Sequence, residues 1–123
     1  MNDSVIIENS SDSRHTFDWR PPDGHLTFRR IDFDKIPSEV FGIYGLWFRK
    51  RCIYVGKAEK QSIVKRLQQH WKGSHNEYLA DWIKAKGPEL RVKYIPVQKT
   101  SIISGIEVLY IRNLQPLTNK IQK

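Results

Sequence analysis

Two short runs of strand-forming residues, separated by a brief basic connection, constrain this sequence most. The first covers Phe41 to Phe48, and the second covers Cys52 to Val55 and ends at Gly56. Both runs are rich in β-branched and aromatic residues, which suit a half-buried pleated surface. Because only Arg49-Lys50-Arg51 separates them, the two strands are predicted to pair as an antiparallel hairpin.

Helix-forming and strand-forming patterns alternate after the hairpin. Apolar residues at intervals of three and four predict helices over Gln61–Lys72 and Asn76–Lys86. Gly87-Pro88 is expected to end the second helix, with Gly87 as a left-handed cap, and Leu90–Tyr94 alternates like a strand. With one more helix before Pro116, the order is strand, strand, helix, helix, strand, helix, which predicts an α+β domain.

The start of the last helix can be placed at two positions. Ser104 and Glu107 have the spacing of a capping box, which places the start at Ser104. The apolar pair at 102–103 favours an earlier start, near Thr100 or Ser101. The apolar face of this helix is expected to consist of Ile103, Ile106, Leu109, Tyr110 and Leu114.

The N-terminal third divides into two segments that precede the main domain, residues 41–123. Residues 1–13 are polar and acidic and are predicted to form a disordered leader. Residues 14–40 are predicted to be an N-terminal extension that packs on the main domain through its aromatic side chains. Within it, Leu26–Phe33 alternates like a strand, and Trp19 suits either packing or stacking on a base.

Positive charge is concentrated in the last two-thirds of the chain. The 123 residues have a formal net charge of +8, and residues 41–123 carry 16 basic and five acidic residues, a net of +11. Such an excess favours an anionic partner, most often nucleic acid. No apolar run is long enough to span a membrane, Cys52 is the single cysteine, and the polar, acidic N-terminal residues are not expected to act as a secretory signal. We therefore expect an intracellular, cytoplasmic protein with no membrane partner.

Residues suited to phosphodiester chemistry are distributed over these elements. Gly42-Ile43-Tyr44 lies on the first strand and Tyr54-Val55-Gly56 on the second. Arg66 and His70 lie one helical turn apart on the next helix. Glu107 lies on the last helix, and Asn119 follows 12 residues later.

Taken in this order, the residues resemble the GIY-YIG nuclease family over roughly residues 41–120. The stretch Tyr54-Val55-Gly56-Lys57-Ala58 is similar to excision-repair and structure-selective members, whereas Arg66, His70 and His75 are similar to phage homing endonucleases. The resemblance implies a small three-stranded antiparallel sheet flanked by helices. It also implies hydrolysis of DNA with one Mg²⁺ (or Mn²⁺) ion per active site, leaving 5′-phosphate and 3′-hydroxyl ends.

Carried over residue by residue, the resemblance gives each of these side chains a role. Glu107 matches the metal ligand, and Arg66 would bind the phosphate through its planar fork. Tyr44 is slightly preferred as general base with Tyr54 as a positioning hydroxyl, and His70 is the rival base or a proton relay. The expected catalytic residues are Tyr44, Tyr54, Arg66, His70, Glu107 and Asn119. The expected phosphate- or DNA-binding residues are Lys57, Arg49, Lys50, Arg51, Lys65 and His75.

Several of these residues could instead have purely structural roles. Tyrosines on strands usually pack in a core, Glu107 can cap its helix or pair with an arginine, and Asn119 can be a turn residue. The alternatives to a DNA endonuclease are a catalytically inactive nucleic-acid-binding module and a structure-selective or RNA-acting nuclease of the same fold. We expect no separate specificity domain, so the candidate partners besides DNA are an accessory specificity protein and a second copy in a homodimer, which double-strand cleavage would favour.

Overall fold

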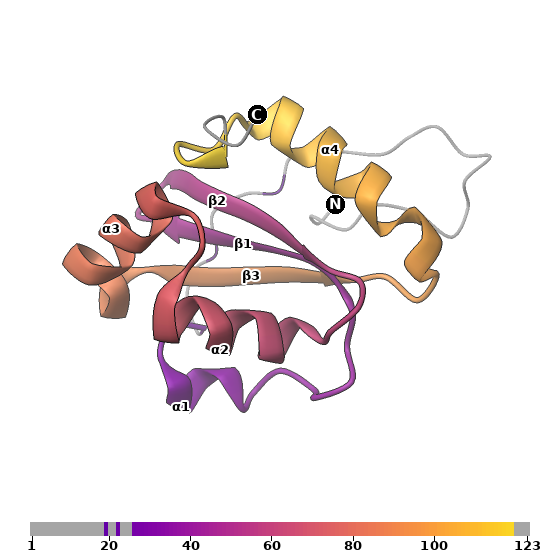
Figure 1. Ribbon diagram of the computed structural model, residues 1–123, viewed down its shortest axis with the longest axis horizontal. Coiled ribbons are helices and arrows are strands. Elements are labelled where there is room, and N and C mark those ends of the chain that lie inside the picture. The colour runs from indigo at the N-terminus through magenta and orange to yellow at the C-terminus, as the bar shows by residue number, and fades with distance from the viewer. Residues whose placement is uncertain (1–18, 20–21, 23–25, 120–123) are drawn as a thin grey trace.

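A three-stranded antiparallel sheet forms the centre of the protein (Figure 1). The computed structural model describes residues 19, 22 and 26–119. The elements in chain order are α1 (Arg30–Phe33), β1 (Gly42–Phe48), β2 (Arg51–Ala58), α2 (Ile63–Gly73), α3 (Glu77–Lys86), the 3₁₀ helix η1 (Gly87–Glu89), β3 (Arg91–Pro96), the 3₁₀ helix η2 (Thr100–Ile102) and α4 (Ile103–Leu114). The order of strands across the sheet is β2-β1-β3. The predicted α+β class, the hairpin and the order of elements after Phe41 are confirmed.

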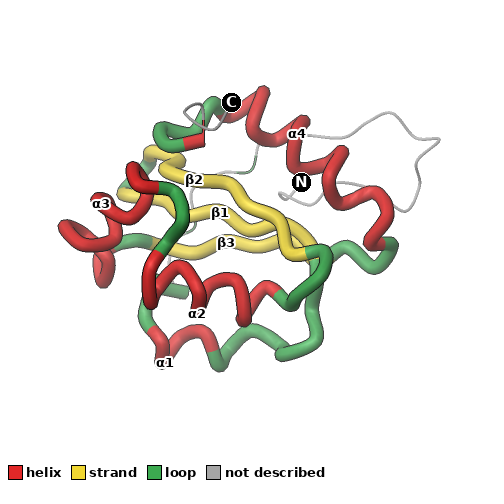
Figure 2. The backbone as a smooth tube through the Cα atoms, in the orientation of Figure 1, coloured by secondary structure: helices red, strands yellow, loops and turns green. Residues whose placement is uncertain are grey.

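Helices cover both faces of the sheet, as the tube in Figure 2 shows, with α1 and α2 on one side and α4 on the other. Alternate residues of β1 therefore enter two different cores. Tyr44 and Leu46 pack on the α2 side, with Leu67 and Leu79. Ile43 and Trp47 pack on the α4 side, in a core completed by Val55, Ile103, Ile106, Tyr110 and Trp19. Both faces of β1 and β2 are thus held by buried apolar contacts.

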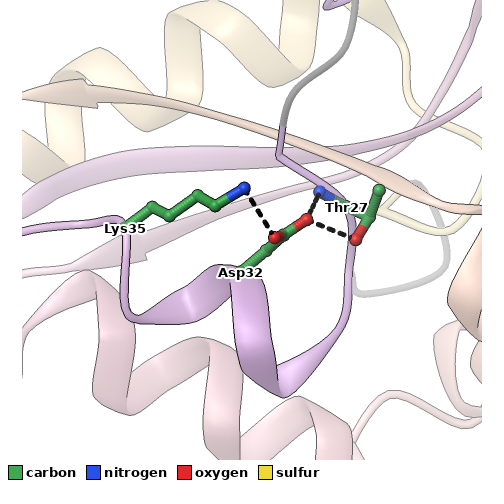
Figure 3. Close-up of polar contacts among 3 residues, drawn as sticks. All are labelled: Thr27, Asp32 and Lys35. Atoms are coloured by element: carbon green, nitrogen blue, oxygen red, sulfur yellow. Dashed lines mark hydrogen bonds and ion pairs between the residues drawn. The ribbon is translucent and has the colours of Figure 1, made fainter.

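The segment before β1 packs on the main sheet but does not contain the expected strand. Thr27 forms only a single bridge with Arg91, and the chain then turns into α1. The Asp32 carboxylate accepts hydrogen bonds from the Thr27 backbone N–H at 2.8 Å and from the Thr27 hydroxyl at 2.6 Å, and it pairs with Lys35 at 3.0 Å (Figure 3). These contacts, led by the Thr27 hydroxyl, hold the pKa of Asp32 well below its usual range. A side chain that binds its own neighbouring backbone favours a turn over a strand.

Aromatic side chains attach this N-terminal segment to both cores. Phe28 and Phe33 are buried beside Trp71 of α2. Trp19 is buried in the opposite core, where its ring meets Tyr110 edge-on at 5.1 Å between centroids. Trp19 is therefore a packing residue and has no surface on which a base could stack. The predicted leader, residues 1–13, and the remainder of the extension lie outside the described residues.

Two details of the predicted helices are wrong. Gly87 is right-handed, with φ −42°, because the chain continues into η1 with Pro88 in its first turn instead of reversing at a left-handed cap. Leu109 is 38% exposed, since α4 turns only one stripe toward the sheet. Of the two starts considered for the last helix, the earlier one is correct: η2 begins at Thr100, so Ser104 lies inside α4 and is not its cap.

Among the residues that the structure describes, no helix combines the length and apolar character needed to cross a membrane.

Candidate active site

Tyr44, Tyr54 and His70 meet on the α2 side of the sheet. The Tyr44 hydroxyl lies 2.8 Å from His70 Nε2, and the Tyr54 ring lies 5.1 Å from the imidazole and 6.1 Å from the Tyr44 ring, between centroids. Tyr44 has no exposed surface, whereas Tyr54 is 6% exposed. The structure therefore brings together three of the predicted side chains, with Tyr44 as the most deeply buried of them.

The two motif glycines explain how Tyr44 reaches this position. Gly56 pairs with Tyr44 across the hairpin, and a Cβ at Gly56 would lie 2.4 Å from the Tyr44 hydroxyl oxygen. Gly42 has φ +151°, and a Cβ there would lie within 2.0 Å of the Ile95 carbonyl oxygen of β3. Only glycine lets the Tyr44 ring cross β2 at Gly56, and only glycine lets β3 approach at Gly42.

Arg66 supplies positive charge to the tyrosines. It lies one turn before His70 on α2, is partly buried, and donates a hydrogen bond from Nη1 to Gln69 Oε1 at 2.8 Å. Burial raises the pKa of both tyrosines, most strongly that of Tyr44, and the nearby Arg66 guanidinium partly offsets that rise in each. A guanidinium close enough to both tyrosines to lower their pKa values, and that also borders the cleft, is suited to bind a phosphate.

His70 is held between Tyr44 and Ser74. Its Nδ1 lies 3.0 Å from the Ser74 hydroxyl oxygen, which also accepts a hydrogen bond from the Asn76 backbone N–H at 3.2 Å. Burial, together with the smaller effects of Arg66 and His75, lowers the pKa of His70 to about 3. His70 is thus a neutral imidazole at physiological pH, with both ring nitrogens in hydrogen bonds.

The depressed pKa of His70 predicts an acid-sensitive fold. Between pH 6.5 and about pH 3 the unfolded chain binds a proton at this histidine that the folded chain does not. Its contribution to the free energy of unfolding is fully present above pH 6.5 and falls by about 1.4 kcal/mol per pH unit below it. Urea unfolding at pH 7 and pH 5 should show this slope in the wild type and in His75→Gln, which changes an exposed histidine. The slope should be reduced in His70→Gln, and equal slopes in all three proteins would contradict the assignment.

Glu107 lies on α4, on the other side of the cluster formed by Tyr44, Tyr54 and His70, across the edge of β2. The side chain is partly buried, and burial raises its pKa, with Lys57 and Arg66 lowering it and Glu59 raising it further. Glu107 in turn raises the pKa of Tyr54, so the carboxylate lies close to the less deeply buried of the two tyrosines. Its position on α4 follows from Ile103, Ile106 and Tyr110, which fix the opposite stripe of the helix in the core.

A small polar cluster that the sequence did not predict borders Glu107. Lys57 Nζ donates to the Ser104 hydroxyl at 2.6 Å and lies 3.4 Å from Glu59, and the Ser104 hydroxyl donates to Glu59 at 2.8 Å. Lys57, Glu59 and Arg66 line an open cleft of about 550 Å³ with Lys60 and Gln61. This cleft is the route by which a phosphate could approach Arg66 and Lys57 together.

A divalent cation is compatible with Glu107, although the protein donors are few. No group of three or more His, Cys, Asp or Glu side chains that could hold a metal occurs in the described ranges, residues 19, 22 and 26–119. Within these ranges, the Glu107 carboxylate makes no hydrogen bond or ion pair. A partly buried carboxylate with free oxygens suits Mg²⁺, which prefers oxygen ligands and keeps several waters.

Asn119 uses its amide to bind the backbone of β2 at Val55, the residue that follows Tyr54. Its Oδ1 accepts from the Val55 N–H at 2.7 Å, and its Nδ2 donates to the Val55 carbonyl at 2.8 Å. The neighbouring Thr118 N–H donates to the Ile53 carbonyl at 3.0 Å, so the tail is hydrogen-bonded along the free edge of β2. Asn119 therefore fixes the strand that carries Tyr54 and Lys57.

Removing this amide should destabilise the protein. Asn119→Ala leaves the buried N–H and carbonyl of Val55 without partners, which is expected to cost about 1–3 kcal/mol in the free energy of unfolding. Urea unfolding measures the change, with Gln98→Ala as the control because Gln98 is an exposed amide in a loop. Equal stability of the two variants would show that Asn119 does not hold the edge.

The predicted DNA-binding residues fall into two places. Lys65 is exposed on the first turn of α2 beside Arg66, and His75 is exposed close to His70. The three basic residues of the hairpin turn lie at the opposite end of β2, roughly 20 Å from Lys57 at about 3.3 Å per residue. These residues, which the structure does not bring to the tyrosines, are Arg49, Lys50 and Arg51.

Four residues that complete the site were not predicted to act in it. The role of Gly56 could have been predicted from the sequence, because the residue belongs to the second motif and lies directly opposite Tyr44 once the hairpin register is known. Ser104 resembled a helix cap, and Glu59 and Ser74 are polar residues in connections with no distinctive spacing.

Comparison with known proteins adds no assignment: no protein-family model matches the sequence, and no curated protein matches it.

Proposed function

We propose that this protein is a metal-dependent endonuclease of the GIY-YIG type that hydrolyses DNA phosphodiester bonds. The observation that carries the proposal is the convergence of Tyr44, Tyr54, His70, Arg66 and Glu107 at one end of the sheet, beside an open basic cleft. These residues come from two strands and two helices that are far apart in sequence. Such a group of perturbed acids and bases is typical of an active site.

The proposed chemistry divides the work among these side chains. Arg66 and Lys57 bind the phosphate from the cleft and balance the negative charge that develops on it. Tyr54, which retains exposure, orients the attacking water, and the tyrosine pair with His70 receives its proton. When a divalent cation is bound at Glu107, it supplies Lewis-acid stabilisation of charge on the phosphate oxygens. The products would be a 5′-phosphate and a 3′-hydroxyl.

Burial modifies the choice of general base. Because Tyr44 has no exposed surface and its pKa is raised well above 10, an isolated tyrosinate is unfavourable there. The 2.8 Å contact with neutral His70 offers the Tyr44 proton a destination that avoids a buried charge. In this proposal Tyr44 therefore acts together with His70 and not as a free phenolate.

Nicking of a supercoiled plasmid tests the proposal. The wild type is expected to nick the plasmid in Mg²⁺ or Mn²⁺ and to be inactive in EDTA. Arg66→Ala should reduce the rate by about 100-fold or more, the usual cost of removing a group that stabilises transition-state charge. Arg112→Ala is the matched control, because Arg112 is exposed in the last turn of α4. Equal nicking by both variants would contradict the role of Arg66.

A further inference from the structure

Hydrogen-bonding groups lead from the cleft through the interior of the protein to the end of α2. Tyr54 is close enough to Glu107 for that carboxylate to raise its pKa, and its ring lies 6.1 Å from the Tyr44 ring between centroids. Tyr44 lies 2.8 Å from His70 Nε2, and His70 Nδ1 lies 3.0 Å from the hydroxyl of Ser74. Ser74 is partly exposed and caps the C-terminal end of α2.

We propose that Tyr44, His70 and Ser74 form a proton path from the candidate active site to solvent at the C-terminal end of α2. In this path Ser74 is a positioning residue: it fixes the tautomer of His70 and exchanges the proton with water. The inference rests on the proposed function for the source of the proton, but the path itself is defined by the hydrogen bonds of the folded protein.

The electrostatics of the path favour transfer without charge separation. Burial raises the pKa of Tyr44 and lowers that of His70, so neither a tyrosinate nor an imidazolium is favourable between them. The positive charges that face His70, those of Arg66 and His75, oppose an imidazolium further. A neutral imidazole can accept a proton at one nitrogen and release another from the second, which keeps every buried group uncharged.

The hydrogen-bond donors indicate which tautomer begins the step. In the proposed path Arg66 and the Tyr54 hydroxyl both act as donors toward the Tyr44 oxygen, so the Tyr44 proton is directed to His70 Nε2, and Nδ1 carries the proton that is donated to Ser74. The Ser74 oxygen also accepts from the Asn76 N–H, which leaves its own proton free to point toward water. The resting state thus has His70 protonated at Nδ1.

The step balances in protons. As the attacking water forms its bond to phosphorus, it gives a proton to Tyr54, the phenolic proton of Tyr54 passes to the buried Tyr44, and the phenolic proton of Tyr44 moves to His70 Nε2, which leaves Tyr54 neutral. The Nδ1 proton of His70 moves to Ser74, and the Ser74 hydroxyl proton passes to solvent. Tyr44, His70 and Ser74 all end neutral, with His70 in the other tautomer. When the same proton transfers run in reverse, one proton moves inward to the product side, and His70 returns to its starting tautomer.

Nitrogen-15 NMR of the histidine side chains tests the path without any substrate. In wild-type protein at pH 7, His70 should be neutral and protonated at Nδ1, with its signal identified from its loss in His70→Gln. Ser74→Ala should shift the tautomer toward Nε2–H, and Ser74→Thr, which retains a hydroxyl, should restore the wild-type signals. Identical His70 signals in the wild type and Ser74→Ala, or an imidazolium at pH 6, would overturn the proposal.

Single-turnover cleavage of a labelled DNA duplex in Mg²⁺ adds the kinetic consequence. Ser74→Ala is expected to slow the chemical step by about tenfold, part of the 10²–10⁴-fold typical of general acid–base catalysis, with unchanged DNA affinity in EDTA. Ser74→Thr should recover the rate. An equally slow Ser74→Thr would show that the serine is only a helix cap and would contradict the path. Absence of cleavage by the wild type would instead contradict the proposed function, while the NMR signals still decide the path.

Discussion

Cleavage of DNA by a Glu107→Gln variant is expected to fall by at least about 100-fold, while the variant stays folded. The substitution keeps the shape of the side chain but removes the negative charge that would hold a divalent cation. Because burial already raises the pKa of Glu107, the neutral amide should be tolerated at no cost in stability. Plasmid nicking over a range of Mg²⁺ concentrations measures the loss, and DNA binding measured in EDTA should be unchanged or stronger.

Glu39→Gln is the matched control for this experiment. Glu39 is an exposed glutamate before β1 that does not line the cleft, so its substitution removes the same charge from outside the proposed site. It should nick at the wild-type rate. If Glu107→Gln behaved in the same way, the carboxylate would have only a structural role, and the metal-dependent part of the proposal would be wrong.

Gly56→Ala should both destabilise the protein and abolish most of its cleavage. The new methyl group would lie 2.4 Å from the Tyr44 hydroxyl oxygen and 2.7 Å from Tyr54 Cε2, so the Tyr44 ring must move and its bond to His70 must break. Overpacking of this kind typically costs about 1–3 kcal/mol. Thermal or urea unfolding gives the stability, and plasmid nicking gives the activity of the fraction that remains folded.

Gly105→Ala adds the same methyl group at a position where there is space for it. Apart from the chain neighbours and the backbone of its own helix, no atom of the described residues lies within 4 Å of the added Cβ, and the residue is exposed in the interior of α4. It should therefore stabilise the protein by about 0.5–1 kcal/mol and leave nicking unchanged. An equal response of the two variants would contradict the view that Gly56 exists to admit the Tyr44 ring.

The elements after Phe41 were predictable because their sequence patterns agree with their final environments. β1 and β2 carry β-branched and aromatic residues on both faces, and both faces are covered in the structure. The segment Leu26–Phe33 was predicted wrongly because its alternation competes with a local side-chain contact. The two hydrogen bonds that Asp32 accepts from Thr27 stabilise a turn, and no periodicity of apolar residues reveals them.

The candidate site was only partly predictable from the sequence. The motif tyrosines, Arg66 and His70 stand on elements whose relative positions follow from the hairpin and the first helix, so their proximity could be expected. The Lys57–Ser104–Glu59 cluster depends on how α4 crosses the edge of β2, which is a tertiary arrangement. The attachment of Asn119 to Val55 likewise requires knowing that β2 is an edge strand.

End mapping of the products from a labelled DNA duplex tests the central claim most directly. The wild type, incubated with Mg²⁺, is expected to release fragments with 5′-phosphate and 3′-hydroxyl ends, and EDTA should prevent their formation. Glu107→Gln and Arg66→Ala, prepared in parallel, exclude a contaminating nuclease if they leave the duplex intact. Salt-sensitive binding of the duplex without any cleavage in Mg²⁺ or Mn²⁺ would contradict the account and would leave a nucleic-acid-binding module in its place.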